Sequence, residues 1–69
     1  MPEYFNPEYN QTYFYWYMNI NGEMMLGMRR CIDSIIDRNN IKNNNCFQTA
    51  EQAEKGKDRV RELLSEERS

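Results

Sequence analysis

The run of aromatic residues from Thr12 to Ile20 constrains the fold more than any other feature of this sequence. Aromatic and β-branched side chains fit the pleated surface of a strand, whereas in a helix they lose side-chain freedom against the preceding turn. Asn21-Gly22 follows and supplies the two residues with positive φ that a type I′ hairpin turn needs. The sequence therefore predicts a β-hairpin whose return strand runs from Glu23 to about Ile32.

A two-residue turn also sets the register of the hairpin. The expected cross-strand pairs are Ile20–Glu23, Met18–Met25, Trp16–Gly27 and Phe14–Arg29 on one face, and Asn19–Met24, Tyr17–Leu26, Tyr15–Met28 and Tyr13–Arg30 on the other. Trp16 opposite Gly27 fits this scheme, because a large ring can lie across the bare backbone of a strand glycine. Both faces of the ribbon are then rich in apolar surface.

A helix is expected near the C-terminus. Thr49 followed by Gln52 is a capping box, which marks the start of a helix. Apolar residues then recur at helical spacing, namely Ala53, Val60, Leu63 and Leu64. Gly56 costs a helix about 1 kcal/mol relative to Ala, which indicates a close approach to the sheet or to another chain.

Residues 33–45 leave alternatives open. Asp33–Arg38 fits either a helical turn or a ragged continuation of the strand, and the asparagines that follow are typical of turns. A short strand at Cys46-Phe47 would add a third strand. The fold class is therefore α+β: a small β-hairpin or three-stranded antiparallel sheet followed by one C-terminal α-helix. We expect an irregular arm over 1–11, one domain over 12–64 and a frayed end over 65–69.

The size of the chain favours self-association. A domain of 69 residues buries only about 60% of the surface that its unfolded chain exposes. One helix covers one face of a small sheet, so the second apolar face would stay bare. A homo-oligomer, either a dimer or a tetramer, would bury that face, and an unpaired edge strand offers a second route to association.

Composition argues against several functions. A net charge of −2 disfavours a binder of long nucleic acids, no apolar run is long enough to span a membrane, and the polar N-terminus is not a signal peptide. With no His and two Cys, one copy cannot build a Cys/His zinc site or a His-based triad. We expect a non-enzyme with no metal and no cofactor. Asp33 and Asp37 are the alternative, because on one helical face they could hold a divalent cation.

Binding is the better prospect. Tyr15, Trp16 and Tyr17 offer ring faces on which a nucleobase can stack. The candidate phosphate ligands are Arg29, Arg30 and Arg38. Asn44 and Asn45 could read a base edge, since each amide carries a donor and an acceptor. This combination suits a small nucleotide-type ligand. The plainer interpretation is that the aromatic strand is core and that the arginines protect a strand edge.

The stretch from Asn45 to Glu54, with the aromatic hairpin and polar loop before it, resembles a pattern found in small proteins of tailed bacteriophages. That pattern runs from an aromatic strand through Asn-x-Phe into a Thr-capped Glu/Ala-rich helix, and the resemblance covers about residues 7–64. Asn45, Phe47 and Thr49 match it. Asn44 stands where the pattern has Gly, and Asn40 stands where it has Arg, with Arg38 nearby.

Members of a group that looks like this are anti-CBASS sponge proteins, which form small oligomers and sequester cyclic nucleotide immune signals. The resemblance implies a non-catalytic phage anti-defence protein in the cytoplasm of the infected bacterial host. Such a protein would hold a nucleotide-type second messenger (a cyclic oligonucleotide or an ADP-ribose-like signal) in pockets between protomers. The alternative is a protein-interaction inhibitor that docks an aromatic and Met-rich surface on a host protein.

Overall fold

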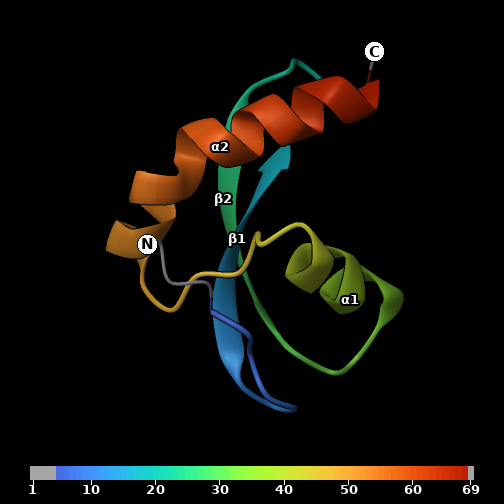
Figure 1. Cartoon of the computed structure of the whole chain (residues 1–69), viewed down its shortest axis with the longest axis vertical. Helices are drawn as coiled ribbons and strands as arrows, with labels where there is room; N and C mark the ends of the chain where they lie inside the picture. The colour runs from blue at the N-terminus through green and yellow to red at the C-terminus, as the bar shows by residue number, and fades with distance from the viewer. Residues whose placement is uncertain (1–4, 69) are drawn as a thin grey trace.

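The chain folds as a β-hairpin followed by two helices. The computed structural model describes residues 5–68, so residues 1–4 of the expected N-terminal arm and Ser69 lie outside the description. The elements are β1 (Thr12–Met18), β2 (Met24–Arg30), α1 (Ile35–Lys42) and α2 (Ala50–Arg68). Figure 1 shows α2 crossing the hairpin and α1 beside the strands. The expected α+β class, the hairpin and the C-terminal helix are confirmed, and the sheet has two antiparallel strands.

The register of the hairpin differs by one residue from the predicted one. Trp16 faces Leu26, and Gly27 faces Tyr15 instead of Trp16. A ring does lie across the glycine, because a Cβ atom added to Gly27 would come 2.8 Å from Cζ of Tyr15. The shift moves every residue of β2 to the opposite face relative to β1.

The turn explains the shifted register. The carbonyl of Asn19 accepts the N–H of Gly22 at 3.0 Å, and its side-chain oxygen accepts the N–H groups of Asn21 and Glu23. Within the turn only Gly22 has a positive φ, of 79°. The connection is therefore a three-residue loop that ends in a left-handed glycine, not the two-residue type I′ turn expected from Asn-Gly.

The expected third strand is reduced to a single bridge. Phe14 and Phe47 exchange two main-chain hydrogen bonds, at 2.8 and 2.9 Å. Beside them the Asn45 side chain takes the place of a strand: its Oδ1 accepts the N–H of Trp16 at 2.9 Å, and its Nδ2 donates to the Trp16 carbonyl at 2.7 Å. The outward main-chain groups of Phe14 and Trp16 are therefore satisfied without a further strand.

The segment left open by the sequence forms a second helix, so the prediction of a single helix was wrong. Ser34 is the N-cap of α1, and its hydroxyl accepts the N–H of Asp37 while the Asp37 carboxylate accepts the N–H of Ser34. This is a capping box in which Asp stands in for the usual Glu.

The C-terminal helix begins as predicted. Oγ1 of Thr49 accepts the N–H of Gln52 at 3.1 Å, and α2 then continues to Arg68. Ala53 and Val60 are fully buried against the hairpin. Guanidinium nitrogens of Arg59 donate to two main-chain carbonyls just after α1, at 3.3 and 2.6 Å, so this side chain connects α2 to the α1–α2 loop.

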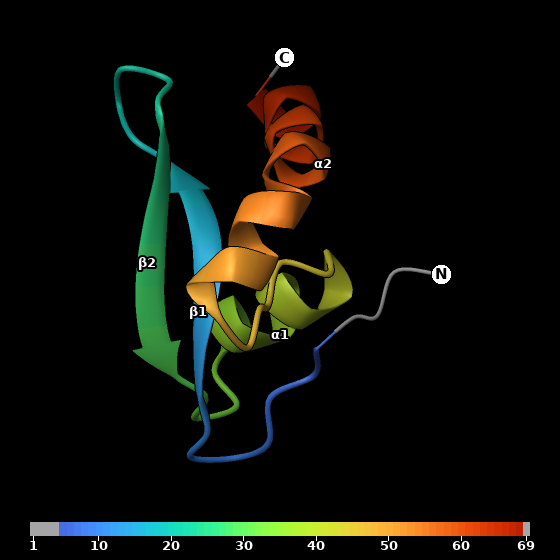
Figure 2. The ribbon, with the colours of Figure 1, turned by 90° about the vertical axis from the view of Figure 1, so that its left-hand side faces the viewer.

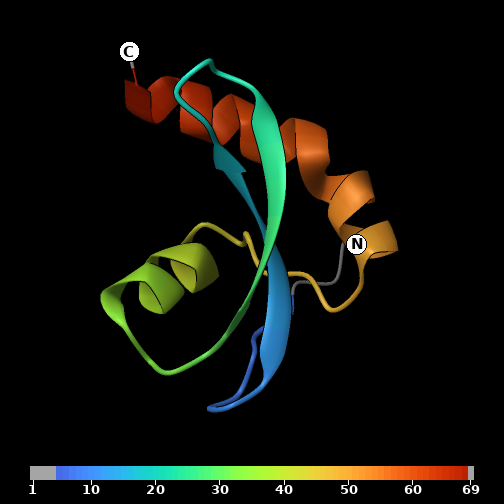
Figure 3. The ribbon, with the colours of Figure 1, turned by 180° about the vertical axis from the view of Figure 1, so that it is seen from behind.

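The two faces of the hairpin carry two separate cores. One, covered by α2, consists of Trp16, Phe47, Ala53 and Val60. The other, on the α1 side, consists of Tyr13, Cys31 and Cys46, with Phe5 of the N-terminal arm packed against it. Figure 2 shows β2 at the margin of the molecule, and in the view from behind in Figure 3 neither helix lies in front of this strand. Neither α1 nor α2 combines the length and apolar character that crossing a lipid bilayer requires.

Gly56 is where α2 comes closest to the core. A Cβ atom at this position would lie 2.6 Å from Cε1 of the Phe47 ring, which is buried. The close approach that the sequence indicated is therefore an approach to Phe47 of the same chain.

Gly56→Ala should destabilise the protein. In an exposed helix this change gains about 1 kcal/mol, but here the methyl group would overpack the Phe47 ring, at a cost of about 1–3 kcal/mol. Urea denaturation measures the difference, and exposed Glu54→Ala, expected to change stability by less than about 0.5 kcal/mol, is the control. A more stable Gly56→Ala variant would contradict this packing.

Candidate functional site

The side chain of Asp37 is the most heavily hydrogen-bonded group in the described structure. It is fully buried and accepts the hydroxyl of Tyr13 at 2.5 Å, Nε of Arg29 at 2.9 Å and the N–H of Ile32 at 2.9 Å. The N–H and hydroxyl of Ser34 complete its shell. Burial acts to raise the pKa of Asp37, but the hydrogen bonds from Tyr13, Ile32 and Ser34 outweigh it and hold this pKa well below its usual range.

Tyr13 and Cys46 stay protonated beside this carboxylate. Burial, and then the hydrogen bond to Asp37, raise the pKa of Tyr13 far above 10.0. Burial and the neighbouring Cys31 raise the pKa of the Cys46 thiol to about 12. A thiol of this kind is a poor nucleophile, and both cysteines are buried and free.

The two aspartates considered for a divalent cation do not share a site. The Asp37 carboxylate is fully occupied by its donors, whereas the exposed Asp33 pairs with Arg38 at 3.3 Å. Asp33 takes a left-handed backbone conformation, with φ of 58°, just before the N-cap of α1. Among residues 5–68 no group of three or more potential ligands is placed to hold a metal ion.

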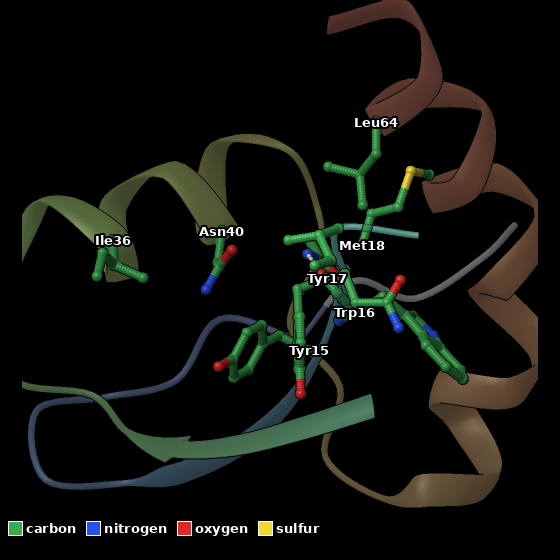
Figure 4. A pocket seen from close by; sticks show the side chains of 10 residues that line it. Tyr15, Trp16, Tyr17, Met18, Ile36, Asn40 and Leu64 are labelled. Atoms are coloured by element: carbon green, nitrogen blue, oxygen red, sulfur yellow. Dashed lines mark hydrogen bonds between the residues drawn. The ribbon is translucent and has the colours of Figure 1, made fainter. Parts of the chain in front are cut away.

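A groove opens between β1, α1 and the C-terminal half of α2 (Figure 4). Its volume is about 440 Å³, within the size range of small-molecule sites. Its lining residues are Tyr15, Trp16, Tyr17, Met18, Asn19, Ile20, Ile36, Asn40, Asn45 and Leu64. None of these side chains is charged, and most are apolar or aromatic.

A row of tyrosines runs along the face of β1 that contributes to the groove. The Tyr13 and Tyr15 rings have centroids 6.0 Å apart, and those of Tyr15 and Tyr17 are 5.7 Å apart. Tyr13 is buried, Tyr15 is partly buried and Tyr17 is exposed. The row therefore leads from the Asp37 cluster out to the solvent, and its outer end offers a ring face to a ligand.

Trp16 belongs to the core and contributes little free ring surface to the groove. Its indole N–H donates to the carbonyl of Ala53 at 2.7 Å, and Nζ of Lys57 lies 5.1 Å from its ring centroid. Figure 4 shows the ring directed toward α2, away from Tyr15. Its neighbour Asn45, also a candidate, is buried with both amide atoms bonded to the Trp16 backbone.

The candidate arginines lie outside the groove lining. Arg29 is partly buried and its charge is compensated by Asp37 at 2.9 Å. Arg38 is exposed and paired with Asp33, and Arg30 is exposed at the end of β2. The structure therefore brings Tyr15 and Tyr17 together and separates them from Arg30 and Arg38.

Asn44, another candidate, lies outside the groove lining and has a backbone role. Its φ of 54° is left-handed, a conformation that Asn tolerates better than most residues with a Cβ atom. Its carbonyl accepts Nη2 of Arg59 at 2.6 Å.

Six residues of the groove lining are not among those predicted for the site, namely Met18, Asn19, Ile20, Ile36, Asn40 and Leu64. Ile36 and Asn40 are four apart and so share a face of α1, a pattern that becomes visible only once this segment is assigned to a helix. Asn40 also donates from Nδ2 to the Tyr13 hydroxyl at 3.0 Å. The capping box of Ser34 and Asp37 was the sequence signal that could have revealed α1.

No family model, curated protein or solved structure matches this chain. The likeness to phage proteins therefore remains a prediction from the motif.

Tyr13→Phe tests the Asp37 cluster. Because Asp37 has a lowered pKa in the folded state, its ionised form stabilises the fold fully above about pH 5, and this contribution is lost as the pH falls further. Removing the Tyr13 hydroxyl should cost about 1.5–3 kcal/mol at neutral pH and clearly less in acid, as measured by urea denaturation. Tyr17→Phe, at an exposed position, is the control. A loss of stability that is the same at neutral and at acidic pH would contradict the role assigned to Tyr13.

Substitutions at Asn44 test its left-handed conformation. Asn44→Gly should leave stability nearly unchanged, whereas Asn44→Ala should cost about 1–2 kcal/mol because a Cβ-bearing residue without local hydrogen bonding disfavours positive φ. Asn43→Ala, at a residue with φ of −87°, is the matched control in the same denaturation experiment. Equal stability of the Gly and Ala variants at position 44 would refute this explanation.

Proposed function

We propose that this chain is a non-catalytic binding protein whose groove receives a planar, nucleobase-like ring. The observation that carries the proposal is the row of tyrosine rings ending at Tyr17 inside an uncharged groove of about 440 Å³. Stacking of a base on an aromatic side chain contributes about 1–3 kcal/mol. The groove offers such a surface beside a hydrogen-bonding amide.

Asn40 supplies that amide. Its Nδ2 donates to Tyr13, which fixes the orientation of the side chain, and within residues 5–68 no hydrogen bond to its Oδ1 is found. An acceptor beside a stacking surface suits the exocyclic amino group of adenine, guanine or cytosine.

The charge distribution narrows the chemical class of ligand that the groove could bind. Since no Arg or Lys lines the groove and Arg29 is compensated by Asp37, the base would supply most of the affinity and phosphate little. Contacts to phosphate would need cationic side chains of a second protomer, in line with the expected pocket between protomers. We propose that the groove sequesters a nucleotide-type immune messenger. This would be a phage anti-defence activity in the cytoplasm of the bacterial host. The motif resemblance supports that role.

Exposed apolar side chains around the groove favour a second candidate, a protein-interaction inhibitor. Ile20 is 95% exposed and Ile36 is 52% exposed. Met25, which is also exposed, lies opposite Tyr17 and therefore on the same face of the hairpin as Tyr17. Large exposed apolar side chains that cluster in this way are typical of protein-binding surfaces. A partner protein would bury this rim together with the groove.

A thermal-shift panel tests the leading proposal. The ligands are adenosine, guanosine and cytidine, their 3′,5′-cyclic monophosphates and cyclic dinucleotides. A ligand at 100 times its Kd adds ~2.7 kcal/mol, and each kcal/mol shifts the Tm of a small domain by about 4–8 °C. We expect the nucleoside and the nucleotide of the preferred base to give similar shifts that depend little on salt.

Matched variants locate the binding site. Tyr17→Ala should reduce affinity by the stacking contribution of about 1–3 kcal/mol, whereas Tyr17→Phe should retain it. Arg38→Ala should bind normally, since Arg38 lies outside the groove lining. A flat panel with folded protein would exclude the nucleobase proposal, and a shift that only phosphorylated ligands produce would place the site at the arginines instead.

A further inference from the structure

The outer edge of β2 carries a row of unpaired main-chain groups. In β1 the N–H and C=O groups of Phe14 and Trp16 point away from β2, toward Phe47 and Asn45. In an antiparallel pair the direction alternates along each strand, and the registered partners of these residues are Met28 and Leu26. The main-chain groups of Leu26 and Met28 therefore point outward, and within residues 5–68 no other segment forms a strand pair with this edge.

Between Met24 and Met28 this edge lacks the usual protection against pairing, because the two arginines lie at the end of the strand. Natural edge strands are blunted by Pro, by inward-pointing charges, by bulges or by a covering element. From Met24 to Met28 the sequence Met-Met-Leu-Gly-Met has neither Pro nor a charged residue, and the ladder to β1 is continuous. Leu26 is 37% exposed and Met28 is 64% exposed. Figure 2 shows β2 at the margin of the fold, with both helices on the far side of β1.

The charges at the two ends of β2 favour an antiparallel arrangement with β2 of a second copy. Exposed Glu23 precedes the strand, and exposed Arg30 ends it. If two copies pair antiparallel, the acidic end of each strand comes beside the basic end of the other, whereas a parallel arrangement would place like charges together. Opposite charges near one another across strands are favourable and like charges are not.

We propose that β2 pairs antiparallel with β2 of a second copy, around a two-fold axis at Gly27, to form a continuous four-stranded sheet. In this register the outward main-chain groups of Leu26 meet those of Met28 of the partner copy, and their side chains meet on the face covered by α2. Gly27 lies on the axis, where strands approach most closely, and it has no side chain there to separate them. The inference is independent of the groove, which lies on the other side of β1.

Amide hydrogen exchange on the full-length protein tests this arrangement residue by residue. In an antiparallel β2 pair the outward amides of Leu26 and Met28 become protected as concentration rises, while those of Met25 and Gly27, already bonded to β1, are protected at every concentration. Sedimentation at micromolar and at millimolar concentration should show conversion from the 8.4 kDa chain to a species of twice that mass. A monomer at all concentrations, or a dimer with unprotected Leu26 and Met28 amides, would overturn the proposal.

Two variants block the edge without breaking the hairpin. Leu26→Pro removes an outward N–H that β1 does not use, so it is the kind of edge position where Pro is tolerated. The double substitution Leu26→Lys and Met28→Lys places like charges across the axis. Both should remain monomeric with unchanged circular dichroism, while Ile20→Lys, in the exposed turn, should still dimerise. If the Leu26→Pro variant unfolds, the double variant decides whether the β2 edge forms the dimer interface. A double variant that still dimerises would refute the proposal.

Discussion

The buried carboxylate of Asp37 is the interaction on which the arrangement of α1 depends. It receives a hydroxyl from β1, a guanidinium from β2, a main-chain N–H from the β2–α1 connection and the capping groups of its own helix. An ionised carboxylate in the interior is tolerable only when it is paired and fully hydrogen-bonded. Any displacement of α1 would leave this charge with missing partners. One residue therefore links α1 to both strands.

The second constraint is the central position of β1. One edge pairs with β2, the other with the Phe47 bridge and the Asn45 amide, and each face is covered by part of a helix. The aromatic side chains of β1 are consequently divided among different tasks. Tyr13 supports the carboxylate, Trp16 joins the core with α2, and Tyr15 and Tyr17 form the wall of the groove. A single aromatic run thus supplies both cores and the candidate site.

This division of roles among the side chains also explains why the structure brings together only some of the residues predicted for the site. Aromatic, Arg and Asn residues were grouped by chemical type, but the fold uses Arg29 to neutralise Asp37 and Asn45 to complete a strand edge. These roles depend on neighbours that are distant in the sequence. Tyr15 and Tyr17 could be predicted to lie together because alternation along a strand places them on one face. Asn40 and Ile36 were not predicted, since their shared face exists only in a helix that the sequence analysis left undecided.

The sequence by itself determined the elements whose signals are local: the aromatic hairpin, the Thr49-capped helix and the apolar stripe of Ala53 and Val60. Aromatic strand preference, helix capping and helical periodicity act over a few residues, so they can be recognised without the fold. The register was set by a local contact that the Asn-Gly signal did not reveal, because the Asn19 side chain closes a three-residue loop in place of the type I′ turn. Tertiary structure decided that residues 35–42 become a helix, because the Asp37 that caps α1 finds its remaining partners, Tyr13 and Arg29, on the two strands. Contacts between residues distant in the sequence had to be formed before this second choice was settled.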